Sequence, residues 1–214
     1  MNNLEFSNEF DILFQNMNAG SAPGLTEYEK SVMLTQASEK VLIDLVASNN
    51  LDIVANSIKT VNILPITGST PLTETSVFFT LPDDYLRLVN EFVKSAESSR
   101  NLSVVPITHE ELKSLLFRPY PYPRKRTAWR VINSNDAVEK LVEIVCRPNC
   151  TAKHYILTYA KLPIPIILDG VTETIRGVTG PSETDLPSSV HPVILETAVQ
   201  LANITYIGTN AQQG

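Results

Sequence analysis

Apolar residues in the first fifty positions recur every three or four residues, which is the spacing of one face of an α-helix. This pattern predicts a first helix over residues 4–17 and a second helix that runs to about residue 48. Glycine and proline between residues 18 and 24 end the first helix, because both disfavour helix continuation. Thr26 and Glu29 have the spacing of a capping box, so the second helix is predicted to begin there.

The pattern then changes to short runs of β-branched and aromatic residues, which favour strands. The predicted strands are residues 61–66, 77–81, 85–94, 102–107, 129–132, 141–146 and 154–161. The third and fourth strands are expected to pair, although the third also fits a helix, and the last strand can form a hairpin with the one before it. A second capping box, Thr108 with Glu111, predicts a short helix through Phe117.

Residues 169–187 are rich in Thr, Gly, Ser and Pro, and they are predicted to form a loop or a mobile arm. Long loops are uncommon in compact domains, so an arm that becomes ordered against a partner is one interpretation. Ser189 is predicted to cap a final helix, Pro192 fits its first turn, and Gly208 is predicted to end it.

These elements predict an α+β fold class. The expected order is N-terminal helices, a central, mostly antiparallel β region with a short helix, and a C-terminal helix. One domain is expected over residues 1–214. Its parts are helical at 1–50, β-rich at 51–168, a loop or arm at 169–187, and a helix with a tail at 188–214.

The chain is acidic, with a formal net charge of −6 over 214 residues and a pI of about 5.1. This balance argues against a general nucleic-acid binder, which is usually basic overall. No apolar run in the sequence reaches the roughly 18 residues that span a bilayer. The first ten residues carry two glutamates and no Lys or Arg, unlike a secretory signal. We therefore expect a soluble protein that is made and kept in a cytoplasm.

The candidate catalytic residues do not form a set with a nucleophile, a base and an orienting group. His109, His154 and His191 are interpreted as surface or capping residues, since no serine lies in a Gly-x-Ser-x-Gly turn. Asp83 and Asp84 follow Leu-Pro and are interpreted as turn residues. The sequence also lacks a phosphate-binding glycine loop. We therefore predict no enzyme, no catalytic residue and no cofactor.

Cys146, Cys150 and His154 are spaced by four residues, as some metal ligands are. On an extended chain they spread over about 26 Å, whereas zinc ligands lie about 2 Å from one ion. No metal site is therefore predicted. The two cysteines are also too far apart for a disulfide on a strand, unless Pro148 turns the chain and brings them together.

The segment 117–130 is unusual because it combines alternating prolines with aromatic and basic side chains. Such side chains are enriched at protein interfaces, but they also bind nucleic acid by phosphate contacts and base stacking. A protein interface, a solvated loop and a nucleic-acid site therefore all remain open, with the interface favoured. The candidate interface residues are Arg118, Tyr120, Tyr122, Arg124, Lys125, Arg126 and Trp129.

Several stretches taken in order resemble the head-to-tail connector proteins of crAss-like bacteriophages and, more broadly, the tail adaptors of short-tailed phages. They are Phe-Asp-Ile-Leu-Phe at 10–14, the helix opening at 22–31, Phe-Thr-Leu-Pro-Asp-Asp at 79–84, Arg-Pro-Tyr at 118–120 with Pro123, Tyr-Ile-Leu-Thr-Tyr-Ala-Lys-Leu-Pro at 155–163, and His-Pro-Val-Ile at 191–194. The resemblance covers most of the chain outside residues 169–187.

The resemblance implies a structural virion protein of the neck or tail, assembled in the cytoplasm of a bacterial host. Its subunits would form a ring, often of twelve, that joins the portal to the tail around the channel for DNA ejection. The expected partners are further copies of the chain, the portal protein and adjacent connector or tail proteins. Double-stranded DNA would pass without specific binding, no membrane is involved, and the family has no catalytic residues to transfer.

Overall fold

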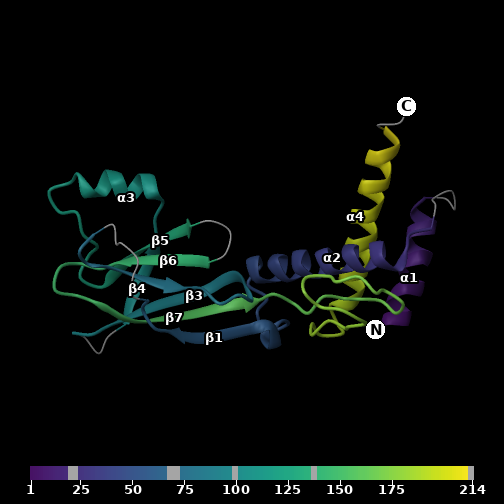
Figure 1. The fold of residues 1–214 in the computed structure, drawn as a ribbon, viewed down its shortest axis with the longest axis horizontal. Coiled ribbons are helices and arrows are strands. Elements are labelled where there is room, and N and C mark those ends of the chain that lie inside the picture. Colours follow the sequence, from purple (N-terminus) through teal and green to yellow (C-terminus); the bar gives the residue numbers. More distant parts are fainter. Residues whose placement is uncertain (19–23, 67–72, 98–100, 136–138, 212–214) are drawn as a thin grey trace. The chain divides into compact units, whose positions relative to one another are not determined.

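The computed structural model describes residues 1–18, 24–66, 73–97, 101–135 and 139–211 (Figure 1). The predicted helix break at 18–24 and the end of the predicted tail lie partly outside these residues. The chain forms two compact units, one of residues 1–58 with 162–214 and the other of residues 59–161. The expectation of one domain over the whole chain stays a prediction.

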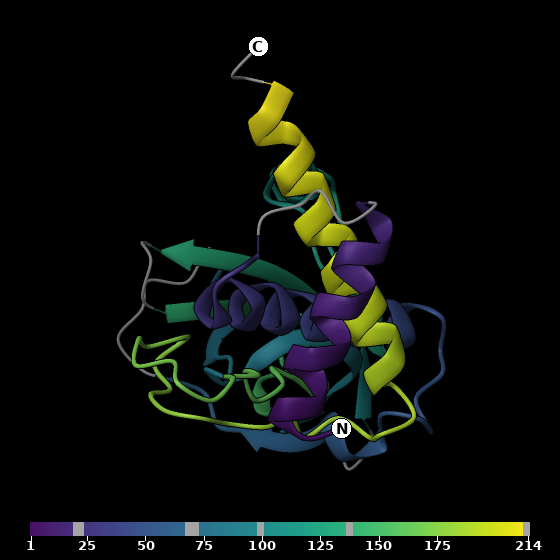
Figure 2. The same ribbon diagram turned by 90° about the vertical axis from the view of Figure 1, so that its right-hand side faces the viewer.

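The first unit is built on three helices, α1 (Asn3–Met17), α2 (Glu27–Ala47) and α4 (His191–Ala211). Figure 2 shows α1 and α4 running side by side, with α4 continuing past the end of α1. Apolar side chains at helical spacing form the core of this unit, as the sequence pattern predicts. They include Phe6, Phe10 and Phe14 of α1, Leu34, Val41 and Leu42 of α2, and Ile194, Ala198 and Val199 of α4.

Capping boxes begin both N-terminal helices. Thr26 and Glu29 form the predicted box of α2, and Asn2 and Glu5 form another at the start of α1. Each box satisfies two backbone N–H groups that have no partner within the helix. The buried ammonium group of Lys30 forms ion pairs with Asp11 of α1 at 2.6 Å and with Glu27 at 2.9 Å, which ties the two helices together.

The two predicted boundaries of the last helix are wrong. α4 begins at His191, after a turn in which the Val190 N–H donates to the Pro187 carbonyl, so Ser189 is not its cap. The helix also continues through Gly208 to Ala211. An isolated glycine costs a helix only about 1 kcal/mol relative to alanine, which is too little to end it.

Residues 169–187 contain no named helix or strand, which confirms the loop prediction. In this structure the segment packs on its own unit, where Val171 and Ile175 are buried with Ile167 and contact Val32 of α2. It contains a tight turn, because Ile175 and Val178 exchange two backbone hydrogen bonds of 3.0 Å. Whether the segment also contacts another subunit stays a prediction.

The second unit is a curled, mixed sheet of seven strands in the order β1-β7-β3-β4-β5-β6-β2. Helix α3 (His109–Leu116) lies over it (Figure 1). The strands are β1 (Ile58–Ile63), β2 (Ser76–Thr80), β3 (Tyr85–Ser95), β4 (Asn101–Pro106), β5 (Thr127–Asn135), β6 (Glu139–Val145) and β7 (Ala152–Lys161). With the three helices of the first unit, this sheet confirms the predicted α+β fold.

Most of the strand predictions are confirmed, including the extended conformation of residues 85–94 and the antiparallel pairing of β3 with β4. The predicted hairpin of the last two strands is wrong. β6 lies between β5 and β2, whereas β7 lies between β1 and β3. β1 also begins three residues before its predicted start, and Ile66 makes only an isolated bridge to Phe78.

Cys146 and Cys150 are buried in the core of the second unit with Tyr155 and Leu157. Both are free thiols. Burial, and then the proximity of Cys150, raise the pKa of the Cys146 thiol to about 12. The chain therefore turns between the cysteines, as the alternative through Pro148 allowed, and the buried thiol is held in its protonated form.

Candidate interaction surface

The strands β4 and β5 are parallel, so a crossover must join them. Helix α3 and residues 117–126 form that crossover. The helix starts at the predicted capping box, in which the Thr108 N–H donates to Glu111 Oε2 at 2.8 Å and the Glu111 N–H donates to Thr108 Oγ1 at 3.2 Å. The topology of the sheet therefore explains why a short helix and an irregular segment interrupt the β-rich region.

Leu112 is the buried residue of α3, and it packs on Val131 of β5 and Val145 of β6. Ile107 and Trp129 pack around the same small cluster. The crossover is thus held to the sheet by Leu112 and by the start of β5. Most of the residues between them are exposed, although Pro123 is buried and Leu115 and Pro121 are half-buried.

The aromatic side chains of this segment are unusually exposed for their size. Tyr120 is 89% exposed and Phe117 is 83% exposed, and Tyr122 is also exposed. The basic side chains of the segment are exposed beside them. We call the set the basic aromatic surface, and its members are Phe117, Arg118, Tyr120, Tyr122, Arg124, Lys125 and Arg126.

Six of the seven candidate interface residues belong to this surface. The seventh, Trp129, is only partly exposed and packs beside Leu112 in the cluster under α3. Its position in β5 directs it to the sheet face that α3 covers. Phe117 was not among the candidates, although its place beside Arg118 in the same proline-rich stretch is a signal that would have found it.

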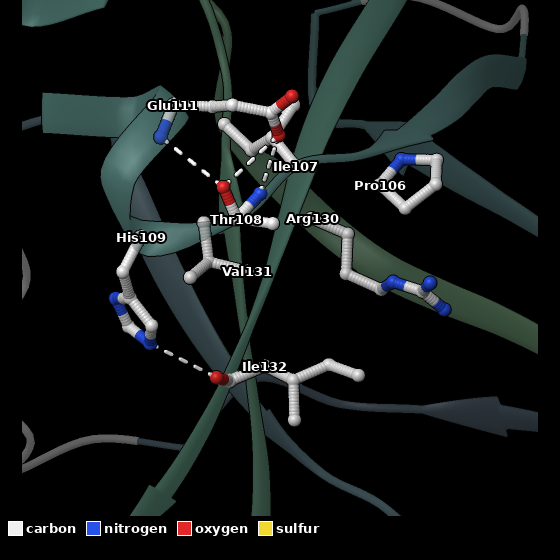
Figure 3. A pocket seen from close by; sticks show the side chains of 8 residues that line it. All are labelled: Pro106, Ile107, Thr108, His109, Glu111, Arg130, Val131 and Ile132. Carbon is white, nitrogen blue, oxygen red and sulfur yellow. Dashed lines mark hydrogen bonds between the residues drawn. The ribbon is translucent and has the colours of Figure 1, made fainter. Parts of the chain in front are cut away.

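A shallow pocket of about 360 Å³ lies between the end of β4, the first turn of α3 and β5 (Figure 3). His109 reaches across it, and its Nε2–H donates to the Ile132 carbonyl at 3.0 Å. Glu111 is directed back to Thr108 of the capping box. The carboxylate and the imidazole thus stabilise the helix start and its attachment to β5.

Arg130 borders this pocket but belongs to a buried polar network. Its Nη1 lies 3.2 Å from Glu91 Oε1, and the Tyr155 hydroxyl donates to Glu91 Oε2 at 2.5 Å. Burial raises the pKa of Glu91, although Tyr155 and Arg130 oppose this change. Burial, followed by the charge of Glu91, also raises the pKa of Tyr155. The network connects β3, β5 and β7 across the interior of the sheet.

Asp83 and Asp84 lie in a turn, as predicted, in which the Tyr85 N–H donates to the Pro82 carbonyl at 3.0 Å. The Asp84 carboxylate also accepts hydrogen bonds from Lys59 at 2.5 Å and from the Tyr159 hydroxyl at 2.7 Å. Burial alone would raise the pKa of Asp84, but these two partners outweigh it and lower the pKa. The carboxylate therefore fastens β1 and β7 to the start of β3.

The interpretation of all three histidines as surface or capping residues is wrong for His191. That ring is buried against Phe6, with centroids 5.2 Å apart. Its Nδ1 accepts from the Met1 ammonium group at 2.9 Å, and its Nε2–H donates to the Leu186 carbonyl at 3.1 Å. These partners explain its burial. His109 is exposed at the start of α3, and His154 is half-buried on β7.

The described part of the chain offers neither a metal site nor a membrane-spanning helix. It contains no group of three His, Cys, Asp or Glu side chains placed to hold a metal ion. None of its helices is both long and apolar enough to cross a bilayer. The basic aromatic surface is an exposed feature of these residues.

The family model of the phage tail ring protein 3/4 matches residues 1–213. The chain belongs to this family. It is 33% identical over 230 residues to ring protein 4/5 of Bacteroides phage crAss001, covering 97% of this chain and 94% of the relative. It is also 32% identical over 231 residues to ring protein 3 of the same phage, covering 96% of each.

Membership of the family confirms the resemblance to crAss-like phage proteins. The aligned regions cover 97% and 96% of the chain, so they include most of the residues of both units. The two compact units described above are therefore both part of what the chain shares with its relatives.

Proposed function

We propose that this chain is a structural subunit of a ring in the neck or tail of a bacteriophage. The observation that carries the proposal is the similarity to two ring proteins of one phage over nearly the full length. The polar side chains around the pocket between β4, α3 and β5 make structural contacts, His109 with Ile132 and Glu111 with Thr108. The chain therefore acts by assembly and not by catalysis.

More specifically, we propose that the ring lies between the portal and the tail, around the channel through which DNA passes. The net charge of −6 supports this placement, because an acidic channel repels the phosphate backbone and lets DNA slide. A ring of twelve copies, with the portal and adjacent ring or tail proteins as partners, follows from the resemblance. Both units would act together as one connector subunit of the virion.

The basic aromatic surface is the proposed contact with neighbouring subunits. Exposed Tyr and Arg side chains are enriched among the residues that dominate binding energy at interfaces. Phe117 and Tyr120 have little packing within the chain to lose if their side chains turn toward a neighbour, because most of their surface is open to solvent. Burying them against a neighbour would remove a large apolar area from water.

Native mass spectrometry tests the ring. The purified chain is measured alone and then with the portal protein of the same phage, since assembly can require that template. The proposal expects a single closed oligomer in at least one of these samples. A strict monomer in both samples, at concentrations where other ring proteins assemble, would overturn it.

A second candidate function is nucleic-acid binding by an accessory protein, and one observation favours it. Lys125, Arg126 and Arg147 line the same pocket of about 310 Å³, in which they outnumber the one carboxylate, Glu97. Such a group of cations can contact phosphate oxygens. Duplex DNA binding that weakens steeply with salt, and that is lost when Lys125 and Arg126 become Gln, would support this function. Salt-independent or absent binding would remove it.

A further inference from the structure

A groove of about 420 Å³ runs between α1 and α4 in the first unit. Leu195 and Val199 of α4 form its buried floor, and Leu13 and Met17 of α1 form an apolar wall. Met17 is 52% exposed, so this wall is open to solvent. The volume lies within the range of roughly 300–1,000 Å³ that is typical of sites for bound groups. We call this feature the α1–α4 groove.

The rim of the groove is acidic. Glu9 of α1 and Glu196 of α4 line it, and both are exposed. Residues 3–17 and 191–211 contain no Lys or Arg, so neither helix supplies a cation beside these carboxylates. Within the described part of the chain, neither carboxylate has an ion-pair partner. An apolar floor with a negative rim suits an occupant that is both aromatic and positively charged.

The chain itself carries such an occupant on its other unit. The basic aromatic surface combines three aromatic rings with four cations, and residues 117–130 contain no Asp or Glu. None of the four cations has an ion-pair partner among the described residues. The groove and the surface are therefore complementary in charge, and each has an exposed apolar part for the other to cover.

We propose that the α1–α4 groove of one copy receives the basic aromatic surface of a neighbouring copy. The aromatic rings, led by Phe117 and Tyr120, enter the apolar groove, and the cations pair with Glu9 and Glu196. Two different surfaces meet in this contact, so it is heterologous. Repeated around an axis, a heterologous contact forms a closed ring when the rotation per copy divides the circle. This inference rests on the proposed function and names the surfaces that would build the ring.

Charge reversal on separate chains tests the contact. The groove variant carries Glu9→Lys with Glu196→Lys, and the surface variant reverses all four cations, with Arg118→Glu, Arg124→Glu, Lys125→Glu and Arg126→Glu. In either variant alone, every contact in a ring joins like charges. In an equimolar mixture an alternating ring joins opposite charges at every contact. The changed residues are exposed, so both variants should fold, which circular dichroism checks.

Assembly is measured by native mass spectrometry under the conditions in which the wild-type chain forms rings. We expect each variant alone to lose rings at least tenfold, roughly the cost of disrupting interface hot spots. The mixture should recover them, with equal amounts of the two variants in each ring. Exposed charges that belong to neither surface give the controls, Asp44→Lys with Asp52→Lys and Lys94→Glu with Lys153→Glu. These controls should assemble like the wild type.

The inference is overturned if either variant assembles alone as the wild type does, or if the mixture fails to recover rings that both variants lose. Those results would leave the ring itself established, since the wild type assembles. If the wild-type chain forms no ring even with the portal protein, the proposed function fails together with the inference. Recovered rings that contain both variants would also show that the contact joins different copies. Mixing two variants could not restore a contact that lies within one chain.

Discussion

At the scale of single residues, the second unit depends on a carboxylate that is buried among partners. Glu91 is only 8% exposed, and Arg130 and Tyr155 contact both of its oxygens. Removing one partner of a buried ion pair leaves the other charge uncompensated, which is far more costly than the loss of an exposed pair. The network is therefore a point where one substitution has a large effect.

We predict that Arg130→Met lowers the free energy of unfolding by about 3 kcal/mol at neutral pH. Burial already raises the pKa of Glu91, and loss of the guanidinium raises it further. The unfolded chain then releases this proton at a lower pH than the folded chain does. Relative to the wild type, the penalty therefore grows as pH rises through the already raised pKa of Glu91 toward the still higher pKa in the variant, and it shrinks in acid. Urea unfolding at several pH values measures this difference.

The matched control adds Glu91→Gln to Arg130→Met, which removes the unpaired charge. The double variant should be more stable than Arg130→Met alone at neutral pH, and its own stability should no longer depend on the titration of a carboxyl group at position 91. Surface substitutions usually change the free energy of unfolding by less than about 0.5 kcal/mol. If Arg130→Met alone changes it by no more than this, the network does not stabilise the second unit.

At the scale of elements, the tight turn in the loop 169–187 depends on backbone conformation. Arg176 and Gly177 are its two central residues, with φ angles of 51° and 79°. A turn with positive φ at both positions is disfavoured for most side chains. The Arg176 side chain also forms an ion pair with Glu39 of α2, which connects the turn to the helix. The loop is thus held by its turn and by its buried apolar residues.

Gly177→Ala is predicted to lower the free energy of unfolding by about 1 kcal/mol, because an added Cβ strains a left-handed residue. There is open space around the position, so the cost comes from φ and not from a clash. Gly24→Ala is the control, since that site is equally open and has no positive φ. Thermal unfolding measures both variants, and equal melting temperatures for the two would contradict the prediction.

Local signals predicted the helices and strands well, because caps and hydrophobic spacing act over a few residues. Thr26 with Glu29 and Thr108 with Glu111 mark helix starts that the structure confirms. Strand order was not predictable in this way. β6 and β7 are neighbours in sequence but not in the sheet, since pairing depends on contacts between distant segments. The same limit applies to Trp129, whose burial depends on where α3 lies.

At the scale of the whole molecule, the family match and the two relatives support a ring protein, as the sequence resemblance also indicates. The exposed rings of the basic aromatic surface and the acidic groove are the features that a subunit in isolation leaves uncovered. Neither could be paired with the other from sequence, because the helices that form the groove are about 180 residues apart.

The most direct test of the central claim is electron cryo-microscopy of intact virions of the phage that encodes this chain. The account predicts a density ring between portal and tail that fits both units of the chain in every subunit. Subunits in that ring should be related by rotation about the DNA channel. A reconstruction in which the neck and tail contain no ring of this chain would contradict the account.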